Sequence, residues 1–80
     1  MKKNLQKKAV RLNSSALKAL DYNEDKNMLT ATFNNNRTYH YINVPEKLWK
    51  EFLSVIDSGK SAGAFINKHI KPFYKSIEIT

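Results

Sequence analysis

The stretch MLTATFNNNRTYHYI, residues 28–42, decides the fold because its pattern predicts a β-hairpin. Apolar side chains at Leu29, Ala31 and Phe33 alternate with threonines, as they do in a half-buried strand. Residues 38–42 alternate again. The asparagines at 34–36 tolerate the positive φ angles that a tight turn requires. We therefore expect two antiparallel strands joined at this asparagine turn.

Two helices are expected after the hairpin. Pro45 suits a first helical turn, where its missing N–H is no loss. An apolar stripe at helical spacing follows, made of Leu48, Trp49, Phe52, Leu53 and Ile56. Residues 57–59 end this helix, and Ser61 can cap a second one. The apolar side of the second helix is Ala62, Phe65, Ile66 and Ile70, and Pro72 stops it.

An isolated hairpin is not stable in water, so the hairpin needs a third strand and a covering helix. Residues 12–22 contain good helix formers, but Lys18 to Tyr22 is the natural third strand. We predict an α+β fold in which a three-stranded antiparallel β-meander packs against two C-terminal helices. Residues 1–11 are expected to be a flexible basic arm, and residues 12–80 a single domain. Whether residues 77–80 add an edge strand stays open.

Charge is the most informative bulk property, with a formal net charge of +7. Residues 1–20 carry six basic side chains and no acid, and residues 58–77 carry four and again no acid. The middle, residues 21–57, carries six acids and four basic residues. This uneven basicity favours a polyanionic partner, most simply nucleic acid. The alternative is that the lysines only keep a small protein in solution.

Several functional classes find no support in the sequence. Without cysteine there are no disulfides or thiolate metal sites. No apolar run approaches the ~20 residues of a membrane span, and the basic start lacks the apolar segment of a signal peptide. We therefore expect a cytoplasmic protein. The Lys- and Asn-rich composition suggests a bacterial cell or a phage-infected host.

Catalytic and nucleotide-binding motifs are incomplete. Gly59-Lys60-Ser61 looks like the end of a phosphate-binding P-loop, but Ser54 stands where that motif needs its first glycine. The two histidines, His40 and His69, lack the spacing of metal ligands, and no spacing supports a catalytic triad. We predict no enzyme, no catalytic residue, no metal, no cofactor and no small-molecule substrate.

Several short sequence features follow one another along the chain. None of them is specific by itself, but their order and spacing together are. They are Ser14-Ser15 before Leu17, Tyr22 before an acidic turn, a strand ending in Phe33, Tyr39-His40-Tyr41, Val44-Pro45, and Ser61-x-Gly63 leading to Phe65, Asn67, Ile70 and Tyr74. In this order the chain resembles the KTSC domain family over residues 12–74. It departs from the family pattern in having Asn34-Asn35-Asn36 where glycine is usual, and in its lysine-rich arm. The resemblance implies a small β-meander with helices, a suspected role in nucleic-acid binding and no established catalysis.

The candidate site is a cationic surface that follows phosphates. Its predicted residues are Lys7, Lys8, Arg11, Arg37, Lys60, Ser61, Lys68, His69, Lys71 and Lys75. As a cap, Ser61 leaves helix N–H groups that attract anions, although a purely structural cap is the commoner role. Tyr39 and Tyr41 share one strand face, where they either join the core or offer bases a stacking platform.

The favoured hypothesis is a small non-catalytic accessory module that binds RNA or DNA mainly through phosphates. The competing hypothesis is a protein-interaction module, such as a phage factor that docks on a host protein, with lysines that match an acidic partner. We expect no membrane partner, and the oligomeric state stays open.

Overall fold

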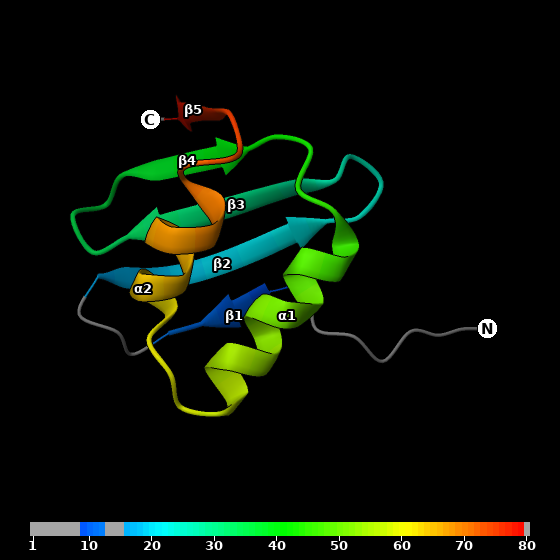
Figure 1. The fold of residues 1–80 in the computed structure, drawn as a ribbon. Coiled ribbons are helices and arrows are strands. Elements are labelled where there is room, and N and C mark those ends of the chain that lie inside the picture. The colour runs from blue at the N-terminus through cyan, green and yellow to red at the C-terminus, as the bar shows by residue number, and fades with distance from the viewer. Residues whose placement is uncertain (1–8, 13–15, 80) are drawn as a thin grey trace.

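The computed structural model describes residues 9–12 and 16–79, in which helical segments cover one face of a five-stranded antiparallel sheet (Figure 1). The strands, which neighbour one another in chain order, are β1 (Ala9–Arg11), β2 (Leu17–Asn23), β3 (Met28–Phe33), β4 (Thr38–Tyr41) and β5 (Ser76–Ile79). The helical segments between β4 and β5 are α1 (Glu46–Asp57), α2 (Ala62–Phe65) and the π-helix η1 (Ile66–Ile70). The predicted α+β class is confirmed.

The β3–β4 hairpin lies where the sequence predicts it. Phe33 donates its backbone N–H to the Arg37 carbonyl at 2.9 Å, and Asn36 donates its own to the Phe33 carbonyl at 2.9 Å. Asn36 has a φ of 67°, in the left-handed region that asparagine tolerates better than most residues. The turn therefore closes without glycine.

The predicted number of strands, three, is wrong because both edges of that meander gain another strand. In β1, Val10 lies opposite Leu20 of β2 and packs against the core. In β5, Ile77 lies opposite His40 of β4. The unpaired backbone groups of an edge strand readily accept such additions. Residues 9–11 of the predicted flexible arm therefore belong to the sheet, whereas residues 1–8 lie outside the described residues.

Helix α1 agrees with the expected apolar stripe, with a small difference at its start. Pro45 is the N-cap, in an extended conformation with φ −69° and ψ 151°, and so precedes the first helical turn. Its carbonyl accepts the backbone N–H groups of Leu48 and Trp49 at 3.0 and 3.2 Å. Just after the C-terminal end of α1, Gly59 has a φ of 81°, which glycine adopts without strain.

The second helix differs from the expected regular α-helix. After the four residues of α2, the chain widens into η1, where Lys71 donates its backbone N–H to the Ile66 carbonyl five residues earlier, at 2.8 Å. Ile66 and Ile70 are both buried, so the spacing of these apolar residues suits a π-helix as well as the expected α-helix. Short π-helical segments are rare and often occur at functional sites.

The core lies between the helices and one face of the sheet. Trp49 is buried, as expected, and its ring stacks on Tyr22 with centroids 5.4 Å apart. The Tyr22 hydroxyl donates to the buried Val44 carbonyl at 2.7 Å, which ties β2 to the segment before α1. Phe52 of α1 stacks on Phe65 of α2 with centroids 4.5 Å apart. These aromatic contacts hold α1 against β2 and α2 against α1.

The opposite face of the sheet carries no helix in the described part of the chain (Figure 1). Arg11, Asp21 and Thr30 are among the residues that line a shallow hollow there. None of the helices within residues 9–12 and 16–79 has the length and apolar character to cross a membrane.

Candidate functional site

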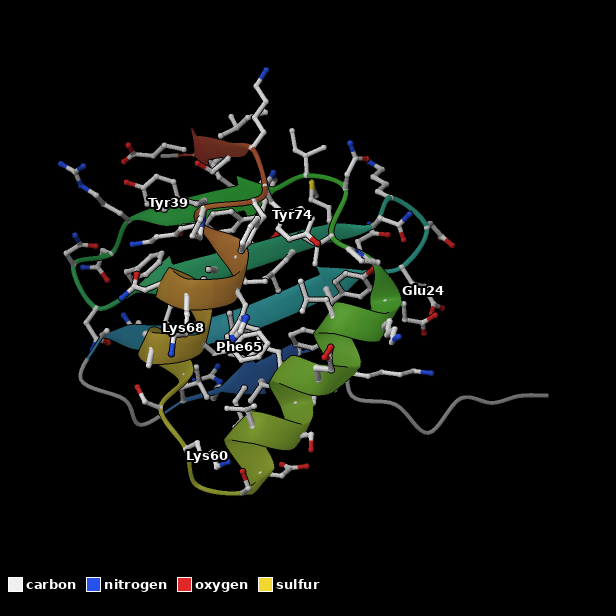
Figure 2. The ribbon with its side chains drawn as sticks, in the orientation of Figure 1. Glu24, Tyr39, Lys60, Phe65, Lys68 and Tyr74 are labelled. Carbon is white, nitrogen blue, oxygen red and sulfur yellow. The ribbon has the colours of Figure 1, made fainter. Side chains whose placement is uncertain are left out.

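One hollow, the hairpin hollow, lies where the β3–β4 hairpin meets the segment that follows η1. It has a volume of about 360 Å³, and it is lined by Phe33, Asn35, Tyr39, Tyr41, Lys71 and Ser76. Strand register brings these residues together, because Tyr39 and Tyr41 lie on the face that the helices cover, and Tyr41 pairs with Ser76. The helical layer stops short of the hairpin end, where Figure 2 shows Tyr39.

Aromatic rings and one ammonium group define the chemistry of the hairpin hollow. The rings of Phe33 and Tyr39 meet edge to face, with centroids 5.7 Å apart. The Lys71 Nζ lies 5.1 Å from the centroid of the Phe33 ring, within cation–π range. Tyr41 is buried in the core and Tyr39 is half-buried against it, and both tyrosines also line the hollow.

Arg37 extends the cationic surface at the rim of the hairpin. A hydrogen bond with the Tyr39 side chain raises the pKa of Arg37, and the carboxylate of Glu78 raises it further. The Arg37 Nε lies 3.8 Å from Glu78 Oε2. Burial, followed by the neighbouring Tyr39, raises the pKa of Tyr41, so this hydroxyl keeps its proton at neutral pH. The rim therefore combines a permanent cation with phenolic hydroxyls.

A second hollow, the helix hollow, lies over the helical layer. It has a volume of about 340 Å³, and its lining is Val55, Lys60, Ser61, Ala64, Phe65, Lys68 and His69. The His69 ring packs on Phe65 with centroids 4.7 Å apart. Figure 2 shows Lys60, Phe65 and Lys68 on the same side of the helical layer. This hollow joins four of the predicted site residues, namely Lys60, Ser61, Lys68 and His69.

Ser61 has a structural contact of its own. Its Oγ accepts the backbone N–H of Ala64 at 3.1 Å, as an N-cap does. Because α2 has only four residues, its dipole adds little attraction for an anion. Gly63 lies close to residue 16: a Cβ at this position would approach Ala16 Cβ to 3.2 Å. Ser61 therefore caps α2, and the absence of a side chain at Gly63 lets α2 approach residue 16 closely.

The other predicted residues are not all brought together. Lys71 lines the hairpin hollow, and Lys75 is exposed just before β5, where its carbonyl accepts the Ile42 N–H at 2.9 Å. Arg11 lies in β1, at the other edge of the sheet from β5, and lines the hollow on the uncovered face together with Asp21. Lys7 and Lys8 lie outside the described residues.

The acidic side chains lie outside the linings of both hollows, and one of them, Glu78, stands at the rim of the hairpin hollow beside Arg37. Neither lining contains an aspartate or a glutamate. Glu24 lies in the β2–β3 turn, at the opposite end of the strands from Tyr39 (Figure 2). Burial raises the pKa of Tyr22, and the carboxylates of Glu46 and Glu24 raise it further, which places both acids near Tyr22 at that end. Two of the acids therefore lie at the end of the strands opposite Tyr39.

Within the described ranges, no group of three or more His, Asp or Glu side chains is arranged to hold a metal ion. The two hollows are instead suited to binding an anion, through lysine ammonium groups, and a flat ring, through aromatic contact.

Sequence reasoning missed Phe33, Asn35 and Ser76 as members of a site. Phe33 and Ser76 lie far apart in the sequence, and they line one hollow because β5 pairs with β4. One local signal exists in the segment KPFYK, residues 71–75, where lysines flank two aromatic residues. Phe73 of this segment is 72% exposed, which is unusual for so large an apolar side chain.

Comparisons with known proteins agree with this architecture. The family model described as KTSC domain matches residues 13–74. A protein of Tsukamurella paurometabola is 29% identical over 66 residues, which cover 82% of this chain and 92% of that protein. The crystal structure of a KTSC domain protein from Yersinia pestis matches with a TM-score of 0.79 and 29% identity, covering 90% of this chain and 96% of that chain. The family match includes the hairpin and the helical segments that line the two hollows.

Proposed function

This chain belongs to the KTSC domain family, and we propose that it is a small non-catalytic accessory module that binds RNA or DNA mainly through phosphate contacts. The observation that carries the proposal is the pair of hollows on the helix-covered side. Their linings contain Lys60, Lys68 and Lys71 and no carboxylate. Such a cluster of lysines attracts a phosphodiester chain, because each neutralised phosphate releases bound counterions.

Exposed aromatic side chains beside these lysines support nucleic acid over a simpler polyanion. Phe73 lies between Lys71 and Lys75 and is 72% exposed, and Tyr39 lines the hairpin hollow. Proteins that bind single strands combine a cationic groove with aromatic rings on which bases stack. A polyanion without bases, such as polyphosphate, gains nothing from such rings.

Electrostatic polarity gives the molecule a direction of approach. The net charge is +7, while Glu24 and Glu46 lie near Tyr22, at the end opposite the β3–β4 hairpin. A polyanion is therefore drawn toward the hairpin and α2–η1, and is repelled from the β2–β3 turn. This direction supports a binding surface over lysines that only keep the protein in solution.

Charge reversal tests the proposal. The double variant Lys68→Glu/Lys71→Glu is expected to weaken binding of a fluorescent single-stranded oligonucleotide strongly, measured by anisotropy in low salt. The matched control is Lys26→Glu/Lys47→Glu, which makes the same change in net charge at the acidic end of the molecule. Equal losses in the two double variants contradict the proposed location. Absence of binding by the unmodified protein in low salt rejects the function.

A second candidate function, protein interaction, is favoured by β5. Ile77 and Ile79 are 49% and 38% exposed, and β5 is the last strand in the sheet order of the described residues. An extended acidic segment of a partner protein can add a strand there, with its carboxylates near Lys75 and Arg37. Stoichiometric capture of one protein after nuclease treatment, abolished by Ile77→Lys, supports this candidate; capture that nuclease abolishes rejects it.

A further inference from the structure

We infer that the hairpin hollow holds one unpaired base of a single strand against the rings of Phe33 and Tyr39, with the adjoining phosphate on Lys71 and Arg37. This inference rests on the proposed function and makes it more specific, because it selects single strands over duplexes. It also assigns a role to Phe33 and Tyr39, which phosphate binding alone does not use.

The size and lining of the hairpin hollow fit a flat ring. Its volume of about 360 Å³ falls within the range of small-ligand sites, roughly 300–1,000 Å³. Three of its six lining residues, Phe33, Tyr39 and Tyr41, are aromatic. Phe33 and Tyr39 are only half-buried, so solvent reaches part of both rings. A ligand that stacks can cover this exposed aromatic surface, whereas a compact anion cannot.

The position of Lys71 indicates how a nucleotide enters. Its Nζ lies 5.1 Å from the centroid of the Phe33 ring, although the residue itself is exposed. A base makes a larger contact with that ring face than a single ammonium group does. The displaced ammonium stays on its flexible stem beside the hollow, where it meets the phosphate of the same nucleotide. Arg37, at the adjacent rim, is a second cation, which a phosphate would share with the carboxylate of Glu78, 3.8 Å from the Arg37 Nε.

Asn35 gives the hollow a polar group for the edge of the base. Its Oδ1 accepts the backbone N–H of Arg37 at 3.0 Å, which orients the side chain within the turn. The Nδ2 of the same amide can then donate to a carbonyl or ring nitrogen of a base. Bases within a duplex are stacked on both faces, so only an unpaired base can use both this donor and the rings.

An abasic probe separates base binding from phosphate binding. The experiment compares a labelled oligothymidylate of about ten nucleotides with an abasic oligonucleotide of the same number of phosphates, at equal salt. We expect the oligothymidylate to bind about tenfold more tightly or better, since one base stacked on an aromatic ring contributes about that much. Equal affinities overturn the inference and leave the proposed function standing. If neither probe binds, both fail.

Phe33→Leu, which keeps an apolar side chain but removes the aromatic ring, locates the effect. Provided that its thermal unfolding remains cooperative, it is expected to lower oligothymidylate affinity about tenfold and to leave the abasic probe unchanged. A folded variant that keeps the full preference for bases overturns the placement. The two-probe comparison on the unmodified protein decides the inference even where this variant does not fold.

Discussion

The salt dependence of binding is the prediction that follows most directly from the two hollows. We expect the triple variant Lys60→Gln/Lys68→Gln/Lys71→Gln to bind a single strand with a flatter dependence on salt. For single strands the slope of log affinity against log salt is about −0.7 for each phosphate neutralised. If all three lysines in the linings contact phosphates, the slope becomes less steep by about 2.1.

That slope difference has a measurable consequence. Between about 50 and 200 mM salt, the unmodified protein loses roughly twentyfold more affinity than the triple variant. Anisotropy of a labelled oligothymidylate of about fifteen nucleotides measures both slopes. The control is Lys26→Gln/Lys47→Gln/Lys50→Gln, which removes the same number of charges from the β2–β3 turn and α1. The reasoning is refuted if both triple variants flatten the slope equally, or if the first leaves it unchanged.

Three predictions concern the fold that carries the hollows. Tyr22→Phe removes the donor to the buried Val44 carbonyl and is expected to lower the free energy of unfolding by about 1–3 kcal/mol in urea titrations; an unchanged midpoint contradicts this role. Burial raises the pKa values of Tyr22 and Tyr41 above 10.0, so their contribution to stability is complete below pH 10 and is lost as the pH rises through the folded-state values. The melting temperature should therefore fall above about pH 10, and Tyr22→Phe should reduce that fall. A melting temperature that does not change with pH in this range contradicts the prediction. Asn43 has a φ of 62°, in the left-handed region. Asn43→Ala should therefore lower the free energy of unfolding by about 1 kcal/mol, whereas Asn43→Gly should leave it almost unchanged. Equal unfolding midpoints for the two variants exclude this backbone strain.

Local patterns were sufficient for the elements that are defined by their own residues. The alternation in residues 28–33 and the asparagine turn predicted β3 and its hairpin, and the apolar stripe after Pro45 predicted α1. The strand count failed because β1 and β5 depend on pairing with distant strands. β1 is only three residues long, and in β5 even the isoleucines remain exposed. The alternation of β1 is too short to be recognised, and β5 has no alternation in burial.

The sequence predicted those site residues that lie close to one another along the chain. Lys60, Ser61, Lys68 and His69 lie on consecutive segments, and they line a single hollow. The hairpin hollow depends on the register of β4 with β5 and on the place where η1 ends, and neither can be derived from composition. Charge counting grouped Arg11 with the C-terminal lysines, but the sheet order places it at the opposite edge from β5.

Mapping the contact surface tests the central claim most directly. Amide chemical shifts of labelled protein, titrated with a short oligothymidylate in low salt, report which residues meet the strand. We predict that the shifts gather at Phe33, Tyr39, Lys68 and Lys71, around the two hollows. Shifts confined to the turn around Glu24 or to β5, or a spectrum that does not change, contradict the account.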